Sequence, residues 1–362
     1  MVHSRIYSTR IAVLVALFSS LPSASLVAEQ PEVTKVEFIV GDYLKAEGGA
    51  TAIKDLPLLR PFGTDFDSRG TMYIVELEGG RVHRLKKDSQ PEVISGDGSK
   101  SYSGDGGPVA KATYNGMHNI GITNDNRIFV SDTFNHCIRE IDLDADTVTT
   151  VSGNGKTGFS GDGKAAKDAQ YNYLMSISLT PTEDALLIAD LKNARIRKLD
   201  LKSMKVSTVA GNGKNGIPKD GAVATESPLV DPRAVAQDSL GNIYILERNG
   251  HALRRVTPEG TITTVAGTGK KGFHDGPALV AQFGSPKHIC VDEQNRVYIA
   301  DDANGAIRCY DPETETVSTL LGRGFGDKKV RLNQPHGVTI EKGNLFACDT
   351  SNNRIFMLSL KN

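Results

Sequence analysis

A unit of about 55 residues repeats along the chain, and this repeat constrains the fold more than any other feature of the sequence. Its clearest copy runs from Arg127 to Asp142 and ends with Val148–Gly153. Apolar and polar residues alternate, break at a turn near Asp132, alternate again and finish in a β-branched run closed by glycine. This is the pattern of consecutive strands joined by hairpins. Repeats of this length, with three or four strands each, predict a β-propeller.

Two independent markers give the same number of repeats. The glycine-closed strand recurs at 36–41, 92–96, 148–153, 206–211, 262–267 and 317–322. A second strand ends in an acidic residue in each copy: Glu76, Asp132, Asp190, Glu247, Asp301 and Asp349. We therefore predict an all-β fold, a six-bladed β-propeller.

The repeat is out of phase at the two ends of the chain. The chain opens with a lone copy of the last strand at 36–41 and closes after 354–358 without one. We expect the N-terminal strand to complete the last blade and so to close the ring. A closed ring leaves no central sheet edge unpaired, which removes a site of aggregation.

The first residues have the layout of a secretory signal peptide. Arg5 and Arg10 precede an apolar run at 11–21, and small residues follow up to Ala28. The run is shorter than the about 20 residues that span a bilayer as a helix. We predict a signal peptide at 1–28 and a propeller at 29–362 that is secreted or periplasmic, with no membrane span after cleavage. Which of the two compartments it enters stays open.

Charge and cysteine usage exclude two classes of function. The formal net charge is -1 and there is no basic tract, which argues against nucleic acid as a partner. Cys137, Cys290, Cys309 and Cys348 form no CxxC pair, so neither a zinc knuckle nor a redox motif is indicated. Each is expected to pack as a small apolar residue, with one disulfide left open.

Long glycine-rich connections join the blades at 96–107, 153–163, 211–221 and 267–276. Loops of this length either pack as ordered flaps or serve a site. They lack the strand-to-helix context and the lysine-serine pair of a phosphate-binding loop. The acids that end the second strands have a simpler explanation than a ring of metal ligands, since Asp and Glu at tight turns accept hydrogen bonds from backbone amides.

The repeated motif resembles the NHL-repeat family of propellers. The resemblance rests on 130–139, 188–197 and 298–308, on the Thr-Val-Ala-Gly strand endings and on the loop Phe159-Ser-Gly-Asp-Gly163. It covers residues 33 to 360 and implies the same six-bladed fold. It leaves the function open, because members of this family bind proteins, bind RNA or catalyse reactions on one scaffold.

The opening residue of each inner strand is the most informative polar position. Counting back from the acids gives Phe62, His118, Met175, Arg233, Lys287 and His336. Four of these six can carry positive charge, so a cationic channel mouth is expected. The partners that fit are an anionic small molecule, a peptide or a protein. The candidate ligand-binding residues are His118, Asn119, Arg233, Lys287, His288 and His336.

His118 and His336 are also candidate ligands for a divalent metal, zinc or calcium. Peptidyl-hydroxyglycine amidating lyases are distantly similar, and that resemblance implies a zinc-binding histidine at the start of alternate inner strands. Pro335-His336 and His118 match two of these positions, whereas Arg233 occupies the third. The other resemblance, to gluconolactonase-like propellers, implies a metal held by Glu, Asn and Asp. The ring of this chain has no glutamate, and Asn119 is the residue that could contribute.

Three functions from different classes remain. A binding module needs the fewest assumptions and is favoured. A metal-dependent lyase or hydrolase centred on His118 and His336 is the alternative, and a chiefly structural surface protein is the third.

Overall fold

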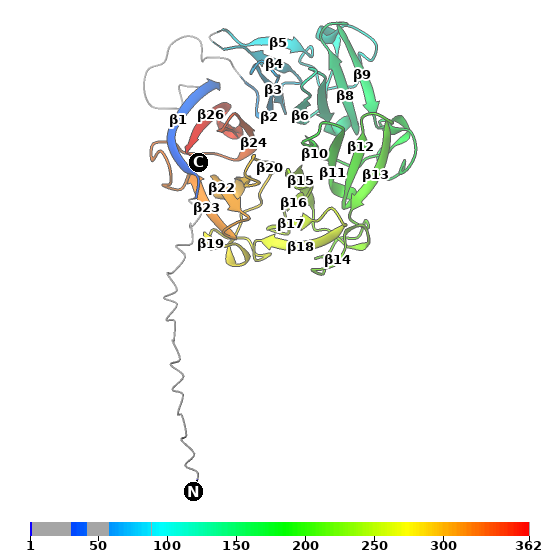
Figure 1. Cartoon of the computed structure of the whole chain (residues 1–362). Coiled ribbons are helices and arrows are strands. Elements are labelled where there is room, and N and C mark those ends of the chain that lie inside the picture. The colour runs from blue at the N-terminus through cyan, green and yellow to red at the C-terminus, as the bar shows by residue number, and fades with distance from the viewer. Residues whose placement is uncertain (2–29, 42–57, 88, 362) are drawn as a thin grey trace.

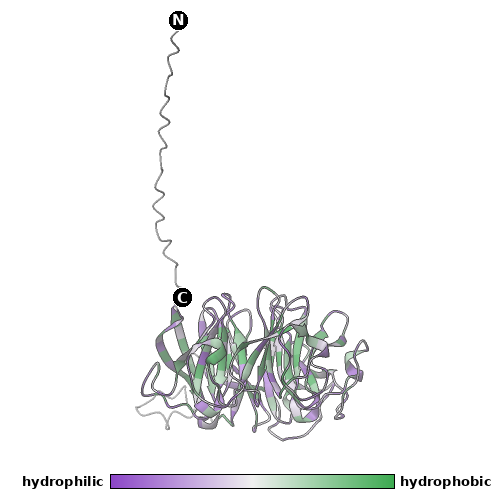
Figure 2. Cartoon of the chain, turned by 90° about the horizontal axis from the view of Figure 1, so that it is seen from below, coloured by the Kyte–Doolittle hydropathy of each residue, from purple (hydrophilic) through white to green (hydrophobic). Residues whose placement is uncertain are grey.

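Six antiparallel sheets surround a central axis, which confirms the predicted six-bladed β-propeller (Figure 1). The computed structural model describes residues 1, 30–41, 58–87 and 89–361. The inner strand of each blade lies near the axis, and the chain then runs outward through the blade before it crosses to the next one. The hydrophobic residues lie mainly along the strands when the ring is seen from the side (Figure 2).

The strands of each blade follow in order from the axis outward. The first blade has β2 (Pro61–Phe66), β3 (Met72–Glu76), β4 (Val82–Leu85) and β5 (Glu92–Ser95). The second has β6 (Met117–Ile122), β7 (Ile128–Asp132), β8 (Cys137–Asp142) and β9 (Thr147–Ser152). The third has β10 (Leu174–Leu179), β11 (Ala185–Asp190), β12 (Arg195–Asp200) and β13 (Lys205–Ala210).

The fourth and fifth blades each gain a short fifth strand at the outer edge. The fourth has β15 (Pro232–Gln237), β16 (Ile243–Glu247), β17 (Ala252–Val256), β18 (Thr261–Ala266) and the edge strand β14 (Ala222–Val223). The fifth has β20 (His288–Val291), β21 (Val297–Asp301), β22 (Ala306–Asp311), β23 (Thr316–Leu321) and the edge strand β19 (Gly276–Pro277). The sixth has β24 (Pro335–Glu341), β25 (Asn344–Asp349), β26 (Arg354–Lys361) and β1 (Glu32–Gly41).

Short 3₁₀ turns interrupt the strands and are the helical elements of the described chain. Four follow second strands: η2 (Thr133–Asn135), η4 (Leu191–Asn193), η7 (Asp302–Asn304) and η8 (Thr350–Asn352). The others lie between blades: η1 (Val109–Lys111), η3 (Ala166–Asp168), η5 (Ala224–Glu226) and η6 (Ala278–Val280). Within the described ranges, no helix has the length and apolar character needed to cross a bilayer.

The N-terminal strand closes the ring as predicted. β1 pairs antiparallel with β26, with Val36 opposite Leu358 and Phe38 opposite Phe356, and so becomes the outermost strand of the sixth blade. The two ends of the propeller are thereby joined in one sheet. The expected signal peptide falls almost entirely in 2–29, which lies outside the described residues.

The core is divided among the interfaces between neighbouring blades. Ile120 of β6 packs with Tyr73 of the first blade, and Ile177 of β10 packs with Phe129 of the second. Apolar residues on both faces of each sheet serve two such clusters, because a strand points successive side chains to opposite faces. The four cysteines are free thiols, buried or partly buried in these interfaces, as expected.

The glycine that closes each outermost strand has a steric cause. Gly153 has φ of 94°, and a Cβ there would lie 2.4 Å from the carbonyl oxygen of His136 on the neighbouring strand. The equivalent glycines are likewise in the left-handed region and meet a neighbouring carbonyl oxygen: Gly41, Gly96, Gly211, Gly267 and Gly322. This close approach explains why the repeat ends in glycine.

The acids that end the second strands anchor both backbone and side chains. Asp301 Oδ1 accepts a hydrogen bond of 2.6 Å from the Gly284 amide, and its Oδ2 lies 2.8 Å from Arg308 Nη1. The acid thus accepts a backbone amide, as expected, but the amide lies 17 residues earlier, just before the inner strand, and not at the turn that follows the acid. The other blades repeat the buried pair: Glu76–His83, Asp132–Arg139, Asp190–Arg197, Glu247–Arg254 and Asp349–Arg354.

The glycine-rich connections pack as ordered flaps, the first of the two expected roles. Their aspartates reach the same arginines, with Asp162 2.7 Å from Arg197 and Asp275 2.6 Å from Arg308. Phe159 and Phe273 lie against these guanidinium groups at 4.8 Å from each ring centre. These two flaps are thus each held by a charged contact and a cation–π contact on one arginine.

Removing one acid of a buried pair should be costly. We expect Asp301→Ala to lower the free energy of unfolding by about 3 kcal/mol, because Arg308 then keeps only Asp275 as a carboxylate partner. Glu92→Ala is the control, since its pair with Arg84 is exposed and should contribute less than about 1 kcal/mol. Urea unfolding of both variants measures the difference. Equal losses would contradict the role given to the buried pair.

Candidate functional site

The inner strands place their side chains in successive layers along the central channel. The first layer holds the second residue of five inner strands and Lys287, which directly precedes β20; the five are Phe62, His118, Met175, Arg233 and His336. The next residue of each strand forms the second layer, which includes Asn119 and His288. The structure therefore gathers the six candidate residues into two adjacent layers.

Phe62 is the centre of the first layer. Its ring centre lies 4.5 Å from that of His118 and 4.4 Å from that of His336. The Arg233 guanidinium lies 5.4 Å from the same ring. Because Phe62 belongs to the first blade and Arg233 to the fourth, this cation–π contact crosses the channel.

The positive charge of this layer comes from two residues rather than four. Burial lowers the pKa of His336 to about 4 and holds the pKa of His118 well below its ordinary value. Both imidazoles are therefore neutral at pH 7, so Arg233 and Lys287 supply the positive charge of this layer. Lys287 Nζ lies 3.6 Å from Asp302, which also lies 3.1 Å from His336 Nε2.

Arg233 has an environment that a guanidinium seldom has. It is 3% exposed, and its Nε and Nη1 have no hydrogen-bond partner within the described structure. Burial lowers its pKa to about 9, so it remains charged at pH 7. The neighbouring acid Asp231 is already paired with Arg248 at 2.7 Å. A buried charge with unpaired donors costs folding free energy unless another group satisfies it.

Exposed aromatic residues stand beside this layer. Phe134 is 40% exposed and its ring centre lies 5.7 Å from that of His118. Tyr173 is 37% exposed and contacts Phe134 edge to face at 5.6 Å. We call Phe62, His118, Arg233, Lys287 and His336, with this aromatic rim, the strand-start mouth.

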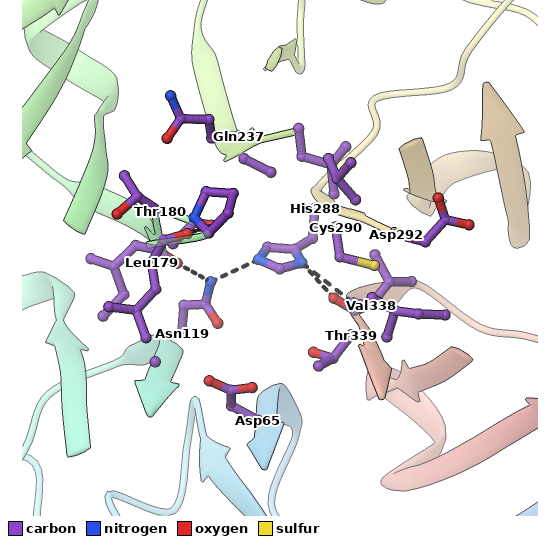
Figure 3. Close-up of a pocket in the computed structure, with 18 of the residues that line it drawn as sticks. Asp65, Asn119, Leu179, Thr180, Gln237, His288, Cys290, Asp292, Val338 and Thr339 are labelled. Carbon is purple, nitrogen blue, oxygen red and sulfur yellow. Dashed lines mark hydrogen bonds between the residues drawn. The ribbon is translucent and has the colours of Figure 1, made fainter. Parts of the chain in front are cut away.

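The second layer closes the channel below the mouth. Asn119 Nδ2 donates to His288 Nε2 at 2.8 Å and to the Ile177 carbonyl at 2.7 Å. His288 Nδ1 lies 3.2 Å from the carbonyl oxygen and 3.3 Å from the amide nitrogen of Val338. Asn119 and His288 come from the second and fifth blades, so this hydrogen bond also crosses the channel (Figure 3). These two residues bond to each other and to backbone carbonyls.

A cavity of about 390 Å³ lies on the other side of this pair, where the inner strands end. Figure 3 shows Asn119 and His288 at its wall, with Asp65, Cys290 and Thr339 around it. The channel thus has two separate ends: the strand-start mouth and this strand-end cavity.

The metal hypothesis receives no further ligand from the geometry. In the part of the chain that the structure describes, no three His, Cys, Asp or Glu side chains converge as a metal-binding group. His118 Nδ1 lies 2.7 Å from the Gly116 carbonyl, which leaves its Nε2 for a ligand. Metal binding by His118 and His336 stays a prediction.

Sequence reasoning missed three residues that shape the site. Phe62 was placed in the first layer but given no role, although it contacts three candidates. Asp302 directly follows Asp301, the acid that ends the second strand of the fifth blade, and it lies 3.6 Å from Lys287. A second acid at this position was a signal that the sequence offered. Asp65 stands at the fourth position of an inner strand, where a lone acid in a six-fold series is a usable signal.

Comparison with known proteins places the fold more firmly than the activity. No protein-family model matches the chain. It is 26% identical over 346 residues to NHL repeat-containing protein 2 of Gallus gallus, a match that covers 84% of this chain and 47% of that relative. The chain thus spans less than half of the relative's length.

Solved structures share the architecture at low sequence identity. An auxiliary nutrient binding protein from Bacteroides ovatus has a TM-score of 0.64 at 13% identity, covering 92% of this chain and 78% of its own. Virginiamycin B lyase from Staphylococcus aureus has a TM-score of 0.55 at 12% identity, covering 90% and 99%. At these identities the likeness shows the fold alone.

Burial of His336 makes stability depend on pH in a defined direction. Its folded pKa of about 4 lies below the ordinary 6.5, so the unfolded chain binds a proton that the folded protein does not. The stabilisation by neutral His336 is present above pH 6.5 and is lost as the pH falls toward 4. Between pH 7 and pH 4 the wild type should lose about 2–3 kcal/mol more unfolding free energy than His336→Gln. Parallel urea-unfolding curves for the two proteins across this range would contradict the assignment.

Proposed function

The chain is an NHL-repeat six-bladed β-propeller, and from this premise we propose that it is an exported binding module that holds an anionic group at the strand-start mouth. The anion is carried by a small molecule or by a peptide.

One observation carries the proposal: Arg233 is a buried guanidinium with unpaired donors in the channel. The guanidinium presents a planar set of N–H groups that match carboxylate or phosphate oxygens. A hydrogen bond to a charged group contributes about 1.5–3 kcal/mol, and the electrostatic attraction is stronger where water is excluded. An anion at this position would satisfy the donors that the folded chain leaves unpaired.

The surroundings of Arg233 favour an anion with an apolar part. Lys287 adds a second cation, partly offset by Asp302. Phe134 and Tyr173 offer exposed rings that can pack against an aromatic or aliphatic portion of the ligand. A binding role agrees with the nutrient-binding role of the Bacteroides ovatus neighbour, and export agrees with the pattern of residues 1–28.

The test uses phenylacetate as the probe and phenylacetamide as its neutral counterpart. We expect phenylacetate to bind by isothermal titration calorimetry and phenylacetamide not to bind. Arg233→Gln should weaken phenylacetate binding about tenfold or more, because the charged hydrogen bonds are lost.

Arg84→Gln is the control, since Arg84 lies on β4, away from the inner strands, and its Nε is already bound to Glu92. It should leave the affinity for phenylacetate unchanged. Equal binding of the acid and the amide, or equal affinities for wild type and Arg233→Gln, would refute the proposed site.

The metal-dependent alternative has one observation in its favour. His118 and His336 both contact Phe62, and His336 Nδ1 has no partner in the described structure. If this alternative holds, elemental mass spectrometry of protein purified without chelator should find about one zinc or calcium per chain, lost in both His118→Ala and His336→Ala. Metal content that neither substitution changes would rule it out.

A further inference from the structure

The strand-end cavity is lined at its centre by one residue from each inner strand. The fourth position contributes Asp65, Gly121, Ser178, Ala236, Cys290 and Thr339, all of which line the cavity. Five of these six side chains are small, which leaves the open space. A volume of about 390 Å³ lies within the range of small-molecule sites in proteins.

Asp65 is the single carboxylate in this ring of small residues. Its Oδ2 accepts a hydrogen bond of 2.7 Å from the Ile122 amide, which fixes the carboxyl group in place. Burial, with a smaller contribution from the carboxylates of Glu341 and Glu183, raises its pKa to about 7. Figure 3 shows Asp65 with His288 and Thr339 among the residues that line the cavity.

The wall of the cavity lacks positive charge. Among the described residues that line it there is no lysine and no arginine, whereas Glu183, Asp238, Asp292 and Glu293 stand with Asp65. Part of this negative charge is already compensated, since Asp292 is paired with Arg296 at 2.7 Å. Asp65 has no such cation beside it, so the strand-end cavity is electrostatically the reverse of the strand-start mouth.

We propose that the strand-end cavity binds a small organic ammonium ion, with the ammonium group against Asp65. An ammonium group supplies the N–H donors and the positive charge that a desolvated carboxylate needs. Ile120, Leu179 and Val338 also line the cavity and give its carbon chain an apolar surface.

A metal ion fits this ring less well. Calcium takes six to eight oxygen ligands, and the fourth-position ring offers one carboxylate with the hydroxyls of Ser178 and Thr339. An ammonium group needs one carboxylate and a few acceptors.

The two sites should bind their ligands independently. The Asn119–His288 hydrogen bond crosses the channel between them. The proposal therefore goes beyond the anion site, and failure of one site leaves the other standing.

The test uses 1,4-diaminobutane as the probe and 1,4-butanediol as its neutral counterpart of similar length. By isothermal titration calorimetry the diamine should bind and the diol should not. Asp65→Asn should weaken diamine binding about tenfold or more while phenylacetate binding at the other end is unchanged. Glu92→Gln removes an exposed carboxylate elsewhere and should leave diamine affinity as in the wild type.

A second variant keeps the test decisive if Asp65→Asn fails to fold. Ser178→Leu retains Asp65 but fills the cavity, and it should also abolish diamine binding. Equal binding of diamine and diol would overturn the proposal, as would full diamine affinity in a folded Asp65→Asn or in Ser178→Leu. Binding of calcium chloride that depends on Asp65, with no binding of the diamine, would overturn it in favour of a metal site.

Discussion

The buried pair between the acid of the second strand and the base of the third strand is the contact on which each blade depends. Its carboxylate receives a backbone amide from the segment that leads into the inner strand, and its arginine reaches out to the flap. One pair therefore ties together the start of the inner strand, the middle of the blade and the connection between blades. Repeated around the ring, it fixes where each inner strand begins and hence which residues face the channel.

Arg233 stands out against this pattern. The five arginines that pair with second-strand acids are buried and have carboxylate partners: Arg139, Arg197, Arg254, Arg308 and Arg354. Arg233, in contrast, is buried on an inner strand with two of its nitrogens unpaired in the described structure. The chain thus contains buried arginines whose guanidinium groups are paired with carboxylates and one, Arg233, whose guanidinium has unpaired nitrogens. Because the propeller supplies acids for the structural arginines, the missing acid at Arg233 points to a ligand. The Asn119–His288 hydrogen bond of the next layer crosses the channel between this cationic end and the acidic cavity around Asp65.

The repeat allowed the architecture to be predicted from the sequence, but it did not predict the contacts and charge states of the residues in the channel. Six blades and the closing strand follow from the glycine and acid positions, which depend on local turn geometry. The arginine partners of those acids were missed because each pair is formed across strands and completed by a distant flap. His118 and His336 were placed in the right layer, yet their neutral state depends on burial that composition does not reveal. Asp65 belongs to no repeated motif. The structure is needed to show that the equivalent residues of the other five inner strands are small and surround the same cavity.

The most direct test of the account is the side-chain ¹H–¹⁵Nε spectrum of the arginines during titration with phenylacetate. The Arg233 signal is assigned from its loss in Arg233→Gln. The account predicts that the Arg233 Nε signal moves with added ligand while those of the paired arginines Arg308 and Arg354 stay in place. Saturating binding that leaves the Arg233 signal unmoved would contradict the claim that its unpaired guanidinium is the site.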